Sequence, residues 1–232
     1  MDKNAKVSKQ KVYTYSKNYY NGELLGTKKH GIGIFTDLNK QMQYEGMWEN
    51  DKRSGKGVLL SIKNDDPRKI YEGEWKDGMR DGTGENWYSS TEYYEGEWAF
   101  NKRDGWGRMY SSDGSIYEGE WKQDKMSGKG LMYMKNGNRY EGQWSNGQKN
   151  GSGKMFFTTT QQLLEGYWVD DICKCGKMGH LPELKLKEED YKPFSVEEAR
   201  AERFPLPPLE LKHGELLLKN TVEAYEEVKM SN

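Results

Sequence analysis

Side chains that could bind a metal ion or a phosphate group are few in this sequence, and their spacing suits neither role. Cys173, Cys175 and His180 offer three soft ligands, whereas a structural zinc site takes four, typically with two residues between paired cysteines. Segment 147–154 has the glycines and lysine of a phosphate-binding loop, but its spacing is one residue too long and no Ser or Thr follows the lysine. We therefore expect no metal and no cofactor.

Catalytic side chains are equally hard to find. The three histidines, His30, His180 and His213, lie far apart along the chain, so no Ser-His-acid or Cys-His arrangement is visible. We expect that the protein is not an enzyme.

The composition indicates a thin fold with large rings in it. An apolar fraction of 34% and a mean hydropathy of -1.10 are typical of disordered chains, yet the 232 residues include 8 Trp and 16 Tyr. The 27 Gly exceed the average share while Pro numbers only 6, which indicates turns and close backbone approach. A thick aliphatic core is not expected.

The charge balance and the cysteines restrict which partners and which cellular compartment are expected. With 36 basic and 37 acidic residues, the chain has no bulk charge to attract nucleic acid. It has no apolar run of about 18 residues and no signal-peptide pattern at its start. Cys173 and Cys175 are one residue apart, a poor geometry for a disulfide. We expect a soluble, cytoplasmic chain with reduced thiols and no nucleic-acid partner.

Aromatic residues and glycines recur at a fixed spacing. Tyr-x-Gly-x-Trp occurs in full five times, first at Tyr44 and last at Tyr140, and degenerate copies at Tyr20 and Leu164 flank these five. Successive copies start 23 to 27 residues apart, and in the first six copies Gly-x-Gly begins 11 residues after the first position. Atypical end copies are expected in a repeat array, because the ends need capping. The repeat glycines of the full copies are Gly46, Gly55, Gly57, Gly73, Gly82, Gly84, Gly96, Gly105, Gly107, Gly119, Gly128, Gly130, Gly142, Gly151 and Gly153.

This pattern predicts β-hairpins. A strand has period two, so the Tyr, Gly and Trp of each copy share one face and the glutamates lie on the other. We expect a six-residue turn over 122–127, after which Trp121 would lie opposite Gly128, Gly119 opposite Gly130 and Tyr117 opposite Met132. Each glycine would then clear space for a ring. The aromatic stripe would comprise Tyr44, Trp48, Tyr71, Trp75, Tyr94, Trp98, Tyr117, Trp121, Tyr140, Trp144 and Trp168.

Stacked hairpins predict an all-β fold: an elongated, single-layer, twisted antiparallel sheet of about 14 strands. Residues 1–19 form a basic extension, residues 20–176 form seven repeats with degenerate first and last copies, and residues 177–232 form a tail. In the last copy Cys175 and Lys177 stand at the two glycine positions, with Gly176 between them. We expect this copy to fray or turn away from the sheet.

Tyr-Glu-Gly-Glu-Trp followed by Gly-x-Gly at this spacing resembles the MORN (membrane occupation and recognition nexus) repeat family over residues 20–176. Three longer strings resemble one branch of this family, which is associated with cilia, flagella and male germ cells. They are Gly105-Trp-Gly-Arg-Met-Tyr110, Lys135-Asn-Gly-Asn-Arg-Tyr-Glu-Gly142, and Glu165-Gly-Tyr-Trp-Val-Asp170 leading to Lys174-Cys-Gly176. The resemblance implies a cytoskeletal location in the axoneme of a cilium or flagellum.

The face opposite the rings has one glutamate per repeat, at positions 45, 72, 95, 118, 141 and 165. Lys56, Arg108, Lys129 and Lys154 can pair with acidic neighbours on this face. It is either an ordinary solvated face or a docking surface for a basic partner. Basic residues also gather at the predicted turns, where they would align along one edge and could meet anionic lipid. These turn residues are Lys52, Arg53, Arg80, Lys102, Arg103, Lys125 and Lys149.

The tail differs in character from the repeats. Residues 195–198 form a capping-box pattern that opens a short helix to about Arg203, and the proline-rich segment 204–209 is extended. Residues 215–230 predict a final helix with Leu218, Val222 and Tyr225 on one face. This helix either folds back over the aromatic stripe or docks on a neighbouring molecule.

These observations favour a non-enzymatic scaffold that binds other proteins, axonemal or cytoskeletal ones by resemblance, through its sheet and its tail. Self-association through terminal strands is a further possibility. The alternative is a peripheral membrane adaptor that binds anionic phospholipids through the basic turns.

Overall fold

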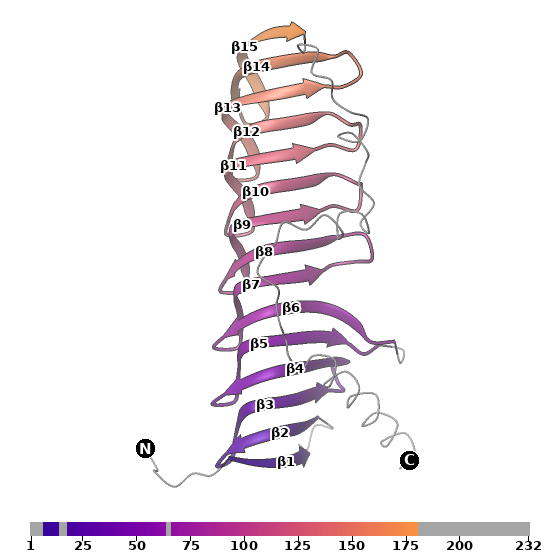
Figure 1. Ribbon diagram of the computed structural model, residues 1–232, viewed down its shortest axis with the longest axis vertical. Coiled ribbons are helices and arrows are strands. Elements are labelled where there is room, and N and C mark those ends of the chain that lie inside the picture. Colours follow the sequence, from indigo (N-terminus) through magenta and orange to yellow (C-terminus); the bar gives the residue numbers. More distant parts are fainter. Residues whose placement is uncertain (1–6, 14–17, 64–65, 181–232) are drawn as a thin grey trace.

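The computed structural model describes residues 7–13, 18–63 and 66–180, and this part of the chain forms one 15-stranded antiparallel sheet. Each strand pairs with the strands that precede and follow it in the sequence, so the strands stack like rungs along the long axis of the molecule (Figure 1). The predicted all-β, elongated, single-layer antiparallel sheet is confirmed. The predicted C-terminal helix, with Leu218, Val222 and Tyr225, lies outside the described residues.

Odd and even strands alternate as the two arms of successive hairpins. The strands are β1 (Val7–Tyr13), β2 (Tyr19–Leu25), β3 (Lys28–Asp37), β4 (Met42–Glu49), β5 (Lys52–Ser61), β6 (Arg68–Lys76), β7 (Met79–Trp87), β8 (Tyr93–Ala99), β9 (Lys102–Tyr110), β10 (Ile116–Lys122), β11 (Lys125–Tyr133), β12 (Arg139–Ser145), β13 (Gln148–Phe157), β14 (Gln162–Val169) and β15 (Ile172–His180).

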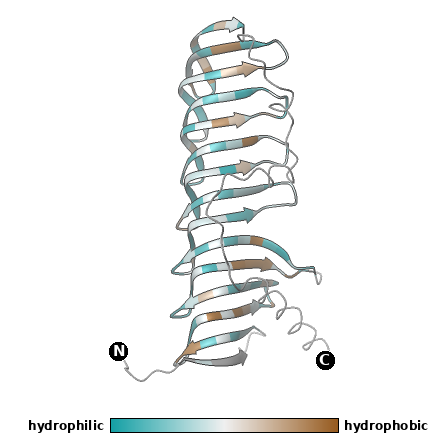
Figure 2. Cartoon of the chain, viewed as in Figure 1, coloured by the Kyte–Doolittle hydropathy of each residue, from teal (hydrophilic) through white to brown (hydrophobic). Residues whose placement is uncertain are grey.

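Hydrophobic and hydrophilic residues alternate along the strands (Figure 2). In β10 the burial alternates likewise, with Tyr117, Gly119 and Trp121 buried and Glu118 and Glu120 more exposed. This is the period of a strand with one covered face. The core is accordingly a row of rings along one face of the sheet, as the sequence predicts.

The turn between the two strands of a repeat is shorter than the sequence predicts. Gln123 and Asp124 alone connect β10 to β11, and both have positive φ, 51° and 69°. This is a type I′ turn, whose twist matches that of the paired strands. The expected six-residue turn over 122–127 is therefore wrong, because its outer residues already pair across the hairpin, Lys122 with Lys125 and Trp121 with Met126.

A bulge in the second strand makes this short turn possible. Gly119 pairs with Gly130 and Tyr117 with Met132 as predicted, but the next pair joins Glu120 to Ser127, so two extra residues are looped out of β11. Trp121 thus does not lie opposite Gly128 in its own hairpin. Within that hairpin it pairs with Met126, and on its other side it pairs with Gly105 of the preceding repeat. The bulge shifts the register by two residues, a shift that alternation alone could not reveal.

Successive turns also bond to one another. The backbone N–H of Asp124 donates to the carbonyl of Arg103 at 3.0 Å, and the N–H of Arg103 donates to the carboxylate of Asp124 at 3.0 Å. The same backbone bond joins Gly78 to Arg53 and Gly147 to Met126, both at 2.9 Å. The row of turns is therefore hydrogen-bonded along the whole edge that these residues form.

The sheet reaches beyond the predicted repeats at both ends. β1 lies within the residues assigned to the basic extension and pairs with β2 over its full length. β15 pairs with β14 from Ile172 to His180, so the last copy does not fray as expected. Gly166 pairs with Gly176, because the bulge of this hairpin has one extra residue instead of two. Gly176 thus occupies the position of the second repeat glycine.

Candidate functional site

The buried rings form one continuous ladder. Tyr117 contacts Trp121 of its own repeat edge-to-face, with ring centroids 5.2 Å apart, and contacts Trp144 of the next repeat at 5.3 Å. Tyr44, Tyr71, Tyr94 and Tyr140 make the same double contact, up to Trp168. Tyr20 has Leu24 in its own repeat and contacts only Trp48, the indole of the next repeat. Edge-to-face packing is the favoured geometry of aromatic pairs. The structure therefore brings the predicted stripe together and adds Tyr20, which the sequence analysis left out.

The polar atoms of the ladder bond within the sheet, except the buried Trp168 indole N–H, which has no hydrogen-bond partner among the described residues. The Trp121 indole N–H donates to the Gly107 carbonyl at 3.1 Å, and the Tyr117 hydroxyl donates to the Glu120 carbonyl at 3.0 Å. The equivalent bonds recur for the indoles from Trp48 to Trp144 and the hydroxyls from Tyr20 to Tyr140. The N–H and O–H groups of these rings therefore already have hydrogen-bond acceptors within the sheet.

The second glycine of each Gly-x-Gly lies under a tyrosine ring. A Cβ added to Gly130 would lie 2.6 Å from ring carbons of Tyr117. A Cβ added to Gly119, on the paired strand, would lie 2.5 Å from the Cα of Gly130. The glycines do make room for rings, but for tyrosine and not for the indole. The residues with these two roles are Gly22, Gly33, Gly46, Gly57, Gly73, Gly84, Gly96, Gly107, Gly119, Gly130, Gly142 and Gly153.

The first glycine of each Gly-x-Gly has a separate role in the bulge. Gly128 has φ 57°, a left-handed conformation that favours glycine, and its nearest neighbour is the Glu120 side chain. The Glu120 carboxylate accepts a hydrogen bond from the Lys129 N–H at 2.9 Å. The expected clash between Gly128 and an indole is therefore wrong. The glycines that share this positive φ are Gly31, Gly55, Gly82, Gly105, Gly128 and Gly151.

Most of the indoles are covered by a cation from the preceding repeat. The guanidinium carbon of Arg53 lies 4.0 Å from the Trp75 ring centroid, and those of Arg80 and Arg103 lie 4.2 Å from Trp98 and Trp121. Lys29 covers Trp48 at 5.0 Å and Lys149 covers Trp168 at 5.4 Å. Sequence analysis missed these contacts. The signal was a basic residue five positions after the Leu or Trp of most copies.

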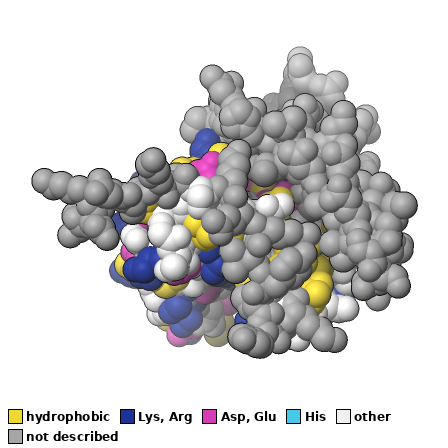
Figure 3. All heavy atoms as spheres, turned by 90° about the horizontal axis from the view of Figure 1, so that it is seen from below, with side chains coloured by type: hydrophobic (Ala, Val, Ile, Leu, Met, Phe, Trp, Pro, Cys, Tyr) yellow, Lys and Arg dark blue, Asp and Glu magenta, His cyan; other side chains and the backbone are white. Residues whose placement is uncertain are grey.

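These contacts change the interpretation of the basic turns. Arg53, Arg80, Arg103 and Lys149 lie over rings on the aromatic face and do not project from the edge as a row. Lys52, Lys102 and Lys125 are the exposed members, and Lys52 forms an ion pair with Asp77 at 2.9 Å. Cations and carboxylates are also interspersed on the end of the molecule shown in Figure 3. The edge thus has a mixed charge.

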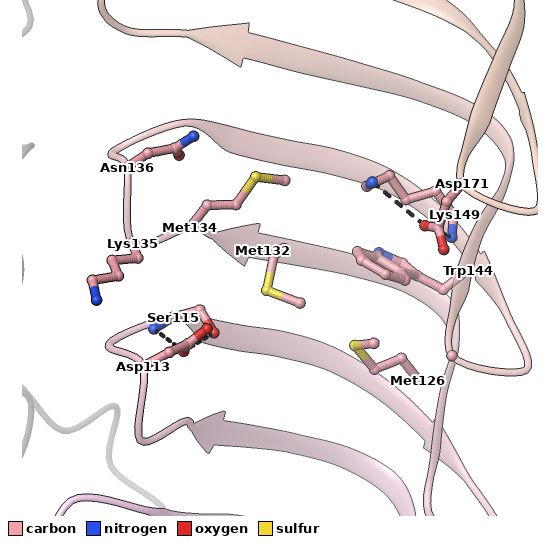
Figure 4. Close-up of a pocket in the computed structure, with 11 residues that line it drawn as sticks. Asp113, Ser115, Met126, Met132, Met134, Lys135, Asn136, Trp144, Lys149 and Asp171 are labelled. Carbon is pink, nitrogen blue, oxygen red and sulfur yellow. Dashed lines mark hydrogen bonds and ion pairs between the residues drawn. The ribbon is translucent and has the colours of Figure 1, made fainter.

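Met126 interrupts this pattern. It stands at the position of Arg103 and Lys149, and within the described residues no cation covers Trp144. Met126, Met132 and Met134 instead line a pocket of about 800 Å³ beside Trp144 (Figure 4). The ion pair between Lys149 and Asp171 bounds one end of the pocket at 3.4 Å. This pocket is an open, largely apolar hollow on the aromatic face.

The opposite face is held by its own ion pairs. Arg108 lies 2.7 Å from Glu118 and 3.7 Å from Glu95, and Lys154 lies 2.6 Å from Glu165. The remaining glutamates of the row are also engaged: Glu72 pairs with Lys69, Glu141 pairs with Arg139 and Glu45 accepts a hydrogen bond from Gln43. Because these carboxylates are already compensated, the row offers little charge to a basic partner.

The same face has a shallow groove of about 1120 Å³ across β9 to β14, with Trp106 at one end and half of its side chain exposed. Glu118, Glu141 and Glu165 line it together with Lys129 and Lys154. Acidic and basic side chains therefore alternate along the groove.

Burial shifts the pKa values of the ladder tyrosines. Removal from water raises the pKa of Tyr140 to about 12 and raises the pKa values of Tyr44, Tyr71, Tyr94 and Tyr117 further above the ordinary range. Burial likewise lowers the pKa values of the guanidinium groups of Arg53 and Arg80. The hydroxyls thus remain hydrogen-bond donors at neutral pH.

Cys173 and Cys175 are free thiols on β15, and Cys173 contacts the backbone carbonyl of Cys175 at 3.4 Å. In the described ranges, no group of three His, Cys, Asp or Glu side chains is arranged to hold a metal ion. Nor does a helix long and apolar enough to cross a membrane occur among these residues.

The chain belongs to the MORN repeat family. The model of this repeat matches residues 20–39, 44–65, 71–89, 94–116, 117–139 and 140–159, which are the hairpins and connections of six of the predicted copies. The chain is similar to MORN repeat-containing protein 3 of Xenopus laevis, with 58% identity over 170 residues, which is 72% of this chain and 71% of the relative. The predicted family is thus confirmed.

Proposed function

We propose that this protein is a non-enzymatic scaffold that binds other proteins in a ciliary or flagellar assembly, at the axoneme and its microtubules, through its repeat sheet and its C-terminal tail. One observation supports it most: in the described part of the chain no second layer packs on the sheet, so no described element covers either long face. The apolar pocket beside Trp144 adds a site that suits a protein side chain. The ciliary compartment rests on the resemblance of the sequence to ciliary MORN proteins.

Membrane binding through the turns has less support. An electrostatic lipid surface needs several uncompensated cations on one side. Here Arg53, Arg80 and Arg103 cover indole rings, and Asp77 and Asp124 neutralise neighbouring charges. Liposome sedimentation separates the two functions: the scaffold predicts no salt-sensitive binding to phosphoinositide vesicles, and strong binding would favour the membrane adaptor.

Localisation tests the scaffold directly. The tagged protein, expressed in a ciliated cell, is expected to concentrate in the axoneme and to remain there after detergent extraction. A diffuse cytoplasmic signal would contradict the proposed compartment. The role of the tail is tested by pull-down with a variant lacking residues 195–232, which is expected to lose a partner that the full chain retains. Retention of every partner would remove the tail from the proposal.

A further inference from the structure

Met126 occupies the position at which most repeats place a cation over the next indole, so its repeat differs chemically from its neighbours. In the preceding repeat, the Arg103 guanidinium covers Trp121 and also contacts the sulfur of Met109 at 3.7 Å. In the repeat of Met126 an uncharged thioether takes that place. Two further methionines, Met132 and Met134, follow on the same strand and its exit. The site is thus apolar where the ladder is elsewhere charged.

The pocket is shaped for an elongated apolar surface with polar ends. Figure 4 shows Met126, Met132 and Met134 spread along its floor, with Asp113 and Lys135 near one end and the Lys149–Asp171 pair at the other. Thioether side chains are flexible and polarisable, and they adapt to apolar partners of varied shape, aromatic rings included. A helix with one apolar face, flanked by residues of both charges, would match the floor and the mixed charges at the two ends.

The chain itself contains such a segment. Residues 215–230 have Leu218, Val222 and Tyr225 at helical spacing, and four glutamates against two lysines. The whole stretch 181–232 has 12 acidic and 8 basic residues. The segment therefore offers an apolar row for the thioether floor of the pocket. It also has glutamates to face Lys135 and Lys149, and lysines to face Asp113 and Asp171.

This segment is also within reach. The described residues end at His180 on β15, and the pocket lies over β11 to β13, only a few strands away. Strands are spaced about 4.8 Å apart, so the separation across the sheet is on the order of 20 Å. The 34 residues between His180 and Glu215 can span several times that distance. Attachment to the same chain gives the segment a high effective concentration at the pocket.

We propose that residues 215–230 dock in the methionine pocket of their own chain, with the face of Leu218, Val222 and Tyr225 against Met126, Met132 and Trp144. A partner that binds the tail must then displace this segment from the pocket. The sheet and the tail are thereby coupled: whatever takes up the tail uncovers the pocket. This inference concerns the free protein and holds whether or not the assembly is ciliary.

Methyl NMR of methionine tests the docking. The protein is labelled at the methionine methyl carbons, and the signals of Met126, Met132 and Met134 are assigned by substitution with leucine. Truncation after residue 210 is expected to shift these three signals and to leave the other methionines of the sheet unchanged. A synthetic peptide of residues 211–232 is expected to restore them. Identical pocket signals in the full and truncated chains would overturn the proposal.

A matched pair of variants tests the site. Met126→Arg places a cation at the position from which it can cover Trp144. Arg103→Met removes the cation that covers Trp121 in the preceding repeat. In the truncated protein, Met126→Arg is expected to weaken peptide binding at least about tenfold, whereas Arg103→Met changes it less than about threefold. Equal binding by Met126→Arg would refute the site. Met134→Glu, at the exposed end of the pocket, provides a second variant with the same expected direction if Met126→Arg fails to fold.

A mixing experiment distinguishes the same chain from a second copy. Labelled truncated protein is combined with an equal amount of unlabelled full chain. The pocket signals of the labelled protein are expected to stay in their truncated positions, because each tail remains on its own chain. Movement of those signals to the positions of the full chain would assign the tail to a second copy and overturn docking on the same chain.

Discussion

Glycine meets two different steric demands in this protein. Gly130 has no side chain because the Tyr117 ring occupies that space, whereas Gly128 is glycine because the bulge requires a φ of 57°. The two positions look alike in the sequence, where both belong to one Gly-x-Gly. They differ in what a replacement would disturb: the ring ladder in one case and the backbone of the bulge in the other.

Gly130→Ala is expected to destabilise the sheet by about 1–3 kcal/mol. The added methyl group would clash with the ring of Tyr117, a residue that is only 2% exposed. Urea unfolding monitored by tryptophan fluorescence measures the change. Gly179→Ala is the control, since an added Cβ there meets no heavy atom within 4 Å. Equal effects of the two substitutions would argue against ring packing as the reason for this glycine.

The Arg103 guanidinium is expected to contribute to stability through the Trp121 ring. Arg103→Met should lower the free energy of unfolding by about 0.5–2 kcal/mol, since it removes a partly buried cation from an indole face. Lys102→Met is the control, because the neighbouring lysine is exposed at the turn. Destabilisation by Lys102→Met but not by Arg103→Met would contradict a contribution of the Arg103–Trp121 contact to stability.

Ionisation of the ladder tyrosines is expected to unfold the sheet at high pH. The pKa of Tyr140 is raised to about 12 in the folded protein, against about 10 in the unfolded chain, so this contribution to stability is complete below pH 10 and declines as the pH rises to 12. The urea midpoint at pH 9 and at pH 11, with phenolate absorbance, measures the decline.

Tyr140→Phe isolates this effect from lysine titration, because Phe has no ionisable hydroxyl. The variant is expected to be less stable than the wild type at pH 9, since it loses the hydrogen bond to the Gln143 carbonyl. Its further loss between pH 9 and pH 11 should be smaller than that of the wild type. A larger loss would be inconsistent with the raised pKa of Tyr140.

At the scale of the hairpin, the type I′ turn imposes a left-handed backbone on residues that seldom adopt it. Phe100 is the first turn residue between β8 and β9, with φ 51° and 69% of its side chain exposed. Asn tolerates this conformation better than a bulky residue. Phe100→Asn is therefore expected to stabilise the protein by about 0.5–1 kcal/mol, measured by thermal unfolding.

Phe100→Ala is the comparison, because it removes the ring but keeps a Cβ without the local hydrogen bonding of Asn. It is expected to leave the unfolding temperature close to that of the wild type. Stabilisation by Ala equal to that by Asn would indicate that the ring, and not the backbone conformation, is unfavourable.

The hairpin also shows where sequence reasoning succeeds and where it fails. The pairs Gly119–Gly130 and Tyr117–Met132 follow from strand periodicity, which constrains residues near the middle of a repeat. Gln123–Asp124 lacks the Asn-Gly or Asp-Gly signature of a type I′ turn. The equivalent turns Asp77-Gly78 and Asn146-Gly147 have it, and this signal was missed, so the turn was predicted too long. The bulge at Gly128 then moved the partner of Trp121 within its own hairpin from Gly128 to Met126, the position that holds the covering cation in most repeats. The cation contacts between repeats depend on this shift.

At the scale of the molecule, whole repeats should be removable units. Deletion of residues 117–139 joins Ile116 to Tyr140 and restores the same order of strands, with Arg103 placed to cover Trp144. The sheet is expected to remain folded and to shorten by about 10 Å, the spacing of two strands. Small-angle X-ray scattering measures the length, and circular dichroism measures the strand content.

Deletion of residues 117–128 is the control, because it removes part of a repeat and leaves a strand without its partner. This variant is expected to lose the cooperative unfolding transition. Equal tolerance of both deletions would argue that the 23-residue period has no structural meaning.

The molecule has a direction that its regular outline does not reveal. From Lys29 onward every repeat except that of Met126 places a cation over the indole of the next repeat, and this gives the array a direction. At the end of the array Cys173 occupies the position of the cation, five residues after Trp168. Extending the array beyond this point by duplication would add an indole that no cation of the preceding repeat covers. The array thus has a chemical terminus, and its two ends are not interchangeable.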